Sequence, residues 1–206
     1  MATPTCPITG HTVSCSVTGT CPVKSPCPTT CTCTTHPATC AWTTLCTVGD
    51  YLKDVVGWKA KTPSQPGVYR IVTPVPGMPL TFGPPKTAPN PLNDPCYLQH
   101  KYDTQKTLMC PDDAKVLYIG KAVNLQNRID RYMRKSKSHS GGCVLWQIDP
   151  PEADQLLIQY CVCNDPASTE TLLLQAFWDR KYARCVAAGI TIPGKPFYYP
   201  LANRQL

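Results

Sequence analysis

Apolar residues follow a regular pattern only from about Tyr51 onward, and their spacing there predicts both helices and strands. The apolar positions of residues 51–58 suit a short amphipathic helix, which should end before Thr62-Pro63 because a residue that precedes proline avoids the helical region. Four compact runs rich in β-branched and apolar residues predict strands, at 68–72, 115–119, 143–148 and 156–162.

Two longer segments have the period of helices. Between residues 122 and 136 the apolar side chains fall on one stripe, which comprises Leu125, Ile129, Tyr132 and Met133. A second helix should begin after Asp165, a favourable N-cap that is followed by proline, and stop at Gly189. This mixture of helices and strands predicts an α/β (α+β) fold.

Residues 73–114 interrupt the pattern with a long, proline-dotted stretch that has no sustained period. Connections of this length without secondary structure are uncommon inside a compact domain and are usually functional or disordered. We therefore expect a long insertion at 73–114 within a domain that spans residues 48–206. Residues 1–47 form a separate extension.

The extension at residues 1–47 is rich in Cys, Thr and Pro. It holds eight of the 14 cysteines and a single charged residue, Lys24, so it has little to pack and should be irregular and poorly ordered. Two alternatives stay open. One is a zinc site completed by His11 or His36, although no cysteine pair has the compact spacing of a zinc knuckle, and the other is a disulfide knot.

The chain contains no run of eighteen apolar residues, which excludes a membrane-spanning helix. Its first residues have neither the basic region nor the apolar region of a secretory signal. We therefore expect a cytoplasmic protein that does not have a membrane as its partner.

Positive charge is concentrated in one segment of the chain. The 206 residues have a formal net charge of +7, and residues 115–137, with seven basic residues and one acidic residue, carry +6. These side chains can form a solvated helix face or an electrostatic footprint for the phosphodiester backbone. The candidates for nucleic-acid contacts are Arg131, Arg134, Lys135 and Lys137. Composition alone does not decide between the two interpretations.

Three short motifs line up around this basic segment. They are Gly67-Val68-Tyr69 in the first strand, Tyr118-Ile119-Gly120-Lys121 at the end of the second, and Arg128 ten residues after Tyr118. This order resembles the GIY-YIG nuclease family, which has two such motifs on adjacent antiparallel strands and an arginine in the following helix. The resemblance implies a small three-stranded antiparallel sheet flanked by helices.

Two further segments are similar to the family pattern, so that the resemblance covers roughly residues 50–206. The helix segment 168–174 carries Glu170, which corresponds to the family's metal-binding glutamate, and Pro200–Asn203 is similar to its closing proline-to-asparagine signature. The resemblance implies hydrolysis of phosphodiester bonds in DNA, with Mg²⁺ or Mn²⁺ held by Glu170 as Lewis acid.

The resemblance also implies roles for the motif residues. Arg128 would hold the scissile phosphate with its planar fork of donors. Tyr69 would act as general base if Lys121 and Arg128 lower the pKa of its phenol. Tyr118 would orient the attacking water, and Asn203 would fix the surrounding geometry. His139 would serve as an extra base or phosphate contact.

The chain departs from the family pattern at several points. Between Tyr69 and Tyr118 lie 48 residues where the family has a short hairpin, and Asn203 lies 33 residues beyond Glu170. His139 is equally explained as an exposed loop residue beside a di-glycine turn. A shift of five residues in the helix register would put the neutral Gln175 at the metal position, where an amide is a poor sole ligand for magnesium.

Two rival functions therefore stay open beside the endonuclease. One is a nuclease-derived nucleic-acid-binding module without catalysis, which Gln175 at the metal position would favour. The other is a metal- or redox-responsive protein that acts through its Cys-rich head.

Overall fold

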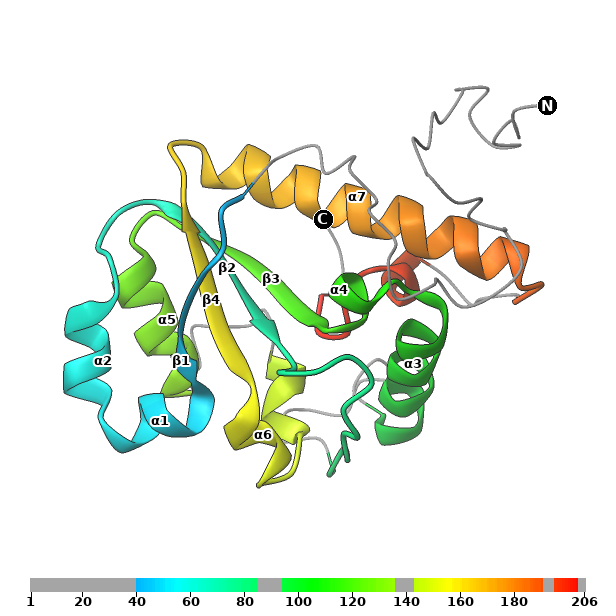
Figure 1. The fold of residues 1–206 in the computed structure, drawn as a ribbon, viewed down its shortest axis with the longest axis horizontal. Helices are drawn as coiled ribbons and strands as arrows, with labels where there is room; N and C mark the ends of the chain where they lie inside the picture. Colours follow the sequence, from blue (N-terminus) through cyan, green and yellow to red (C-terminus); the bar gives the residue numbers. More distant parts are fainter. Residues whose placement is uncertain (1–39, 85–93, 136–142, 191–194, 204–206) are drawn as a thin grey trace.

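The computed structural model describes residues 40–84, 94–135, 143–190 and 195–203, and a four-stranded antiparallel sheet lies at its centre (Figure 1). The strands are β1 (Thr43–Thr47), β2 (Gly67–Val72), β3 (Val116–Ala122) and β4 (Leu157–Val162). Their order across the sheet is β1-β4-β2-β3. The two motif-bearing strands, β2 and β3, are therefore direct antiparallel neighbours.

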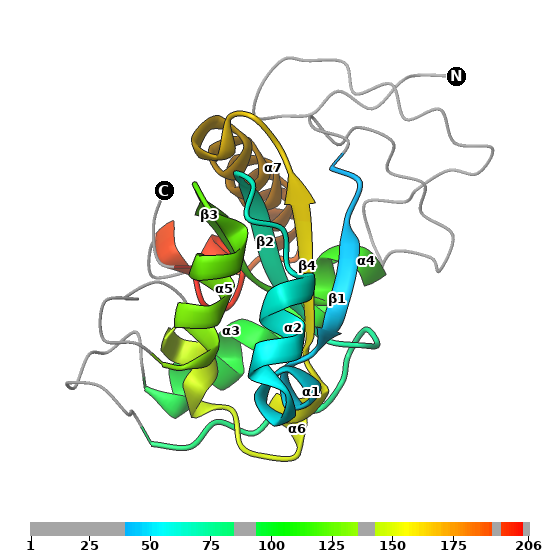
Figure 2. The same cartoon turned by 90° about the vertical axis from the view of Figure 1, so that its left-hand side faces the viewer.

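Helices cover both faces of this sheet, as the two views in Figure 1 and Figure 2 show. Helix α5 packs on one face with α1 and α2 beside it, and the long helix α7 packs on the other. The longer helices are α1 (Val48–Lys53), α2 (Val55–Lys61), α3 (Pro95–Leu108), α5 (Leu125–Met133) and α7 (Pro166–Ala187). The short helical turns are α4 (Pro111–Ala114), η2 (Cys143–Gln147), α6 (Glu152–Gln155) and η3 (Lys195–Tyr198).

Each face of the sheet has its own hydrophobic core, because successive side chains of a strand point to opposite faces. Tyr69 and Ile71 of β2 join the core that includes α5. Val72 of the same strand joins the core that includes Leu174 and Phe177 of α7. The predicted class of fold, helices flanking an antiparallel sheet, is confirmed.

The sequence signals for α5 and α7 are also confirmed. The predicted stripe of α5 is buried at all four positions. Asp165 caps α7 by accepting a hydrogen bond from the Ser168 amide at 3.1 Å, and Gly189 follows the helix with a φ of +67°. A left-handed residue of this kind ends a helix, and glycine adopts it without a steric penalty.

The sheet has four strands where the resemblance implied three. The additional edge strand β1 comes from residues 43–47, which the sequence assigned to the extension. The predicted strand at 143–148 is wrong, since residues Cys143–Gln147 form the 3₁₀ turn η2. Val144 and Leu145 are buried there. A short apolar run fits a buried turn as well as a strand, because burial on all sides removes the polar positions that would reveal the period.

The insertion at 73–114 is not a stretch without secondary structure, because it contains α3 and α4. The buried stripe of α3 has helical spacing, but two of its members are polar: Leu98, Lys101, Tyr102 and Gln105. A lysine and a glutamine at buried positions hide the apolar period from a reading of the sequence. Asp94 caps this helix by accepting a hydrogen bond from the Tyr97 amide at 3.1 Å.

No helix in these four described segments combines the length and the apolar character needed to cross a membrane. The predictions for the Cys-rich head, including the zinc site, concern mainly residues 1–39 and lie outside the described residues.

Candidate functional site

Three tyrosines form a buried cluster where β2 and β3 meet α5. The rings of Tyr69 and Tyr118 lie 5.7 Å apart between centroids. Tyr132 of α5 stacks on Tyr118, with centroids 5.9 Å apart and planes inclined by 2°. All three residues are at most 4 % exposed. The fold thus brings together the two motif tyrosines, as the sequence predicted, and adds a third that the sequence marked only as part of a helix stripe.

Gly120 of the second motif lies against these rings. A Cβ at this position would lie 2.8 Å from the Tyr118 hydroxyl and 2.9 Å from Cε1 of Tyr69. Both distances are shorter than van der Waals contact, so a side chain would displace the tyrosines. The glycine therefore permits the close approach of the two rings to β3.

Arg128 reaches the same cluster from α5. Its Nε is buried and has no hydrogen-bond partner among the described residues, while its side chain also hydrogen-bonds to the Tyr118 phenol. A buried donor without a partner loses its hydration and gains nothing in return. Arg128 therefore has an unpartnered N–H that could donate a hydrogen bond to an oxyanion.

The tyrosines are poorer bases than the sequence suggested. Burial raises the pKa of Tyr69 well above its ordinary value of 10.0, and the nearby Tyr118 raises it further, while Arg128 only partly opposes these effects. Burial also raises the pKa of Tyr118, although a hydrogen bond from Tyr69 and the charge of Arg128 act in the opposite direction. The condition on which Tyr69 would act as general base, a lowered pKa, is therefore not met, because the cost of burying a phenolate exceeds the attraction of Arg128.

Lys121 pairs with Glu170 at the end of β3, where α7 begins. Lys121 Nζ and Glu170 Oε2 are 2.9 Å apart, with the two side chains 52 % and 17 % exposed. The Glu170 carboxylate is also close enough to Tyr118 to raise the pKa of that phenol. Gln175, in contrast, is exposed one and a half turns further along α7 and donates a hydrogen bond to Asp179 at 2.8 Å.

Among the described residues, no three histidine, cysteine, aspartate or glutamate side chains gather into a metal site. Glu170 stands as a single carboxylate, with one oxygen engaged by Lys121. Such a donor set fits only a cation that keeps most of its water, as Mg²⁺ does when it binds one or two carboxylates and a substrate phosphate.

Asn203 is bound to the outer edge of β3. Its Oδ1 accepts from the Ile119 amide at 2.9 Å, and its Nδ2 donates to the Ile119 carbonyl at 2.8 Å. Lys101 of α3 holds this segment in turn, donating to the carbonyls of Leu201 at 3.0 Å and of Asn203 at 3.1 Å. The amide of Asn203 is thus used to position β3, next to Tyr118 and Gly120.

The residues predicted to contact nucleic acid lie in different surroundings. Arg131 is exposed and lines a depression of about 570 Å³ that also includes Arg128 and Lys121. Arg134 pairs instead with the nearly buried Asp130 at 2.9 Å, and Lys59 binds the same carboxylate at 3.1 Å. Lys135 is exposed just after α5, and its φ is 53°. Lys137 and His139 lie outside the described residues.

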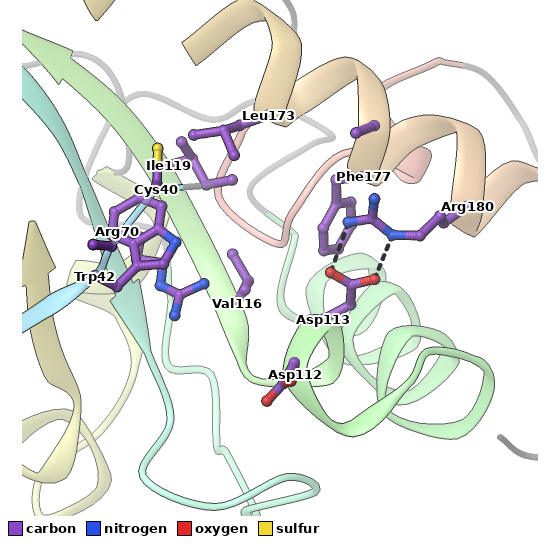
Figure 3. Close-up of a pocket in the computed structure, with 12 residues that line it drawn as sticks. Cys40, Trp42, Arg70, Asp112, Asp113, Val116, Ile119, Leu173, Phe177 and Arg180 are labelled. Carbon is purple, nitrogen blue, oxygen red and sulfur yellow. Dashed lines mark hydrogen bonds and ion pairs between the residues drawn. The ribbon is translucent and has the colours of Figure 1, made fainter. Parts of the chain in front are cut away.

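A second hollow of about 430 Å³ lies on the face that α7 covers, away from the tyrosines (Figure 3). Its arginines already have partners. Arg180 binds Asp113 through two nitrogens at 2.6 and 2.8 Å. The Arg70 guanidinium lies 4.3 Å from the centroid of the Trp42 ring and donates to Gln159 at 2.7 Å. These contacts join strands and helices, which is a structural role.

Two site residues escaped the sequence analysis. Lys101 and Gln105 of α3 both bind backbone next to the motif strand, and Gln105 Nε2 donates to the Val116 carbonyl at 2.6 Å. Their i, i+4 spacing on the stripe with Leu98 was the available signal. Comparison with the models of known protein families, with curated proteins and with solved structures finds no match to this chain.

Proposed function

We propose that this chain is a DNA endonuclease of the GIY-YIG type, which hydrolyses phosphodiester bonds with Mg²⁺ or Mn²⁺ in the cytoplasm. The observation that carries the proposal is the buried, unpartnered Nε of Arg128 beside Tyr118. An arginine that lines an open depression and keeps an unpartnered donor suits a phosphate oxygen, and preorganised donors of this kind stabilise the charge that develops during hydrolysis.

Each residue around Arg128 would have its own role in the hydrolysis of the phosphodiester. Arg128 would bind a non-bridging oxygen of the scissile phosphate. Tyr118, whose raised pKa keeps it protonated at neutral pH, would donate a hydrogen bond to the attacking water or to the phosphate. Tyr69 lies fully buried behind it and hydrogen-bonds to Tyr118, so Tyr69 would hold that phenol in place rather than take a proton itself.

Glu170 would hold the divalent ion, and Lys121 would neutralise charge at the same place. The ion, when bound, supplies Lewis acidity and neutralises charge on the phosphate oxygens. Lys121 binds one oxygen of Glu170 at 2.9 Å. The second oxygen of the same carboxylate would then bind the cation. Asn203 and Lys101 would act at a distance, by holding β3 in register.

Cleavage of a supercoiled plasmid tests the proposal, with Mg²⁺ or Mn²⁺ compared with a chelator. The chain has two glutamates, so Glu170→Gln has a matched control in Glu152→Gln on α6. We expect metal-dependent nicking by the native chain and by Glu152→Gln, and none by Glu170→Gln. Equal cleavage by both variants would show that Glu170 does not hold the metal.

One observation favours a second candidate, a nucleic-acid-binding module without catalysis. The ion pair with Lys121 neutralises the carboxylate that the reaction needs. This candidate predicts that the native chain retards DNA in a gel shift and does not cut it with Mg²⁺ or Mn²⁺.

A further inference from the structure

A depression of about 570 Å³ opens beside Arg128, between the start of α5 and the start of α7. Its lining combines an apolar part with a cationic part. Ala122, Val123, Pro166 and Ala167 supply the apolar part. Arg128 and Arg131 supply two positive charges, and Lys121 adds an ammonium group that is already paired with Glu170. This volume lies within the range of roughly 300–1,000 Å³ that small-molecule sites occupy.

Val123 is the least expected member of this lining. Its side chain is 87 % exposed although it directly follows a strand whose other apolar residues are buried. An exposed valine beside Arg128 and Arg131 buries little apolar surface and so adds little to the stability of the fold. It offers an apolar surface at a position where the charges attract an anion.

The lining of the depression as a whole favours an anionic ligand that also has an apolar part. Among the described residues that line it, Asp165 is the carboxylate, and its oxygens are engaged by the Ser168 amide at 3.1 Å and the Ser168 hydroxyl at 2.6 Å. Asn124 Oδ1 likewise accepts from the Asn127 amide at 2.9 Å. The side-chain amide of Asn127 is exposed and could form hydrogen bonds with a bound ligand.

We infer that the depression binds the nucleobase next to the scissile phosphate, unstacked from its neighbours. Arg128 belongs both to this depression and to the tyrosine cluster, so a phosphate on Arg128 places the adjoining base over Val123 and Ala167. Arg131 meets the next phosphate along the strand. The inference rests on the proposed function for the position of the phosphate, and it names the part of the substrate that is recognised.

Direct binding tests this inference without any need for cleavage. The probes are deoxyadenosine 5′-monophosphate and deoxyribose 5′-phosphate, which differ only by the base, and both are titrated into the full chain in the presence of a chelator. Chemical shifts of the Val123 methyl groups and the Ala167 amide report binding at the depression. We expect the nucleotide to bind about fivefold or more tightly than the sugar phosphate, as apolar contact of one base with Val123 and Ala167 allows.

A matched pair of valines separates the depression from the rest of the surface. Val123→Ser should weaken nucleotide binding about fivefold and leave the sugar phosphate unaffected, because it removes apolar contact without changing charge. Val56→Ser on α2, where the valine is 79 % exposed, should change neither affinity.

The outcomes distinguish this inference from the proposed function. Equal binding of the two probes, or binding of neither, overturns the base site whatever the plasmid assay shows. Base-dependent binding that Val123→Ser weakens supports the site even if the native chain does not cut DNA, and then only the endonuclease proposal fails. Loss of base preference in Val56→Ser as well would assign the effect to the fold and overturn the inference.

Discussion

The depression beside Arg128 and the hollow at Arg70 both contain arginines, but the two differ in what those arginines already bind. In the hollow, Arg180 forms a two-pronged ion pair with Asp113, and Arg70 is held by Trp42 and Gln159. Beside the depression, Arg128 keeps a buried Nε without a partner among the described residues. Paired arginines stabilise a fold, whereas a donor held in place without an acceptor is suited to binding.

The largest expected effect comes from Arg128→Ala. We expect the rate of plasmid cleavage to fall about 10²- to 10³-fold, as removal of one preorganised donor to a developing charge does in other enzymes. The free energy of unfolding should fall by only about 1 kcal/mol, because the variant loses the hydrogen bond to the Tyr118 phenol but no partner at Nε. Chemical denaturation and single-turnover cleavage measure the two quantities. A strongly destabilised variant would place Arg128 with the structural arginines.

Arg180→Ala should show the opposite pattern. The substitution leaves Asp113, whose side chain is 7 % exposed, without its ion-pair partner. We expect the free energy of unfolding to fall by about 3 kcal/mol, the usual cost of a buried carboxylate left unpaired. Cleavage per folded molecule should not change. A large loss of cleavage in a folded Arg180→Ala protein would mean that the hollow takes part in the reaction.

Lys101→Met tests whether the insertion positions the motif strand. The variant loses two hydrogen bonds to the carbonyls of Leu201 and Asn203, and we expect a loss of stability of about 2 kcal/mol. Exchange of the Ile119 amide, which Asn203 covers, should become faster. Lys106→Met on the same helix is the control, because Lys106 pairs with a half-exposed Asp103. Unchanged exchange at Ile119 would leave Lys101 with no effect on β3.

The last prediction concerns the tyrosines behind Arg128 at high pH, where Tyr69→Phe should change the slope of stability against pH. Burial raises the pKa of Tyr69 and of Tyr132 well above 10.0, so the folded chain holds these protons more tightly than the unfolded chain. Their contribution to stability is complete below about pH 10 and is lost as the pH rises above it. Each should lower the free energy of unfolding by about 1.4 kcal/mol per pH unit in that range. Tyr69→Phe should reduce this slope, and an unchanged slope would show that Tyr69 ionises freely.

Sequence reasoning succeeded where one residue type has one structural meaning. Asp165 before a proline and Gly189 after the last turn set the ends of α7, and four apolar side chains set the buried face of α5. It failed where a polar residue is buried or an apolar run forms no strand. Lys101 and Gln105 hid the helix α3, and Cys143–Gln147 formed a turn instead of a strand.

The candidate site could likewise be predicted only in part from the sequence. The order of Tyr69, Tyr118 and Arg128 along the chain was enough to expect their approach, because adjacent antiparallel strands bring the two motifs together. The pKa of each phenol depends on how deeply it is buried, which no short motif encodes. Asn203 was named from the resemblance alone, and its hydrogen bonds to Ile119 depend on a tail that folds back along β3 from far away in the sequence.

Chemical rescue of Arg128→Ala tests most directly whether the unpartnered Nε–H group of Arg128 binds the scissile phosphate. The measurement is the single-turnover rate of plasmid cleavage with and without methylguanidinium, for Arg128→Ala and for Glu170→Gln. We expect the added guanidinium to restore part of the rate in Arg128→Ala and none in Glu170→Gln, because it replaces only the missing donors. Native-like cleavage by Arg128→Ala without the additive, or no rescue at any concentration that leaves the fold intact, would contradict the account.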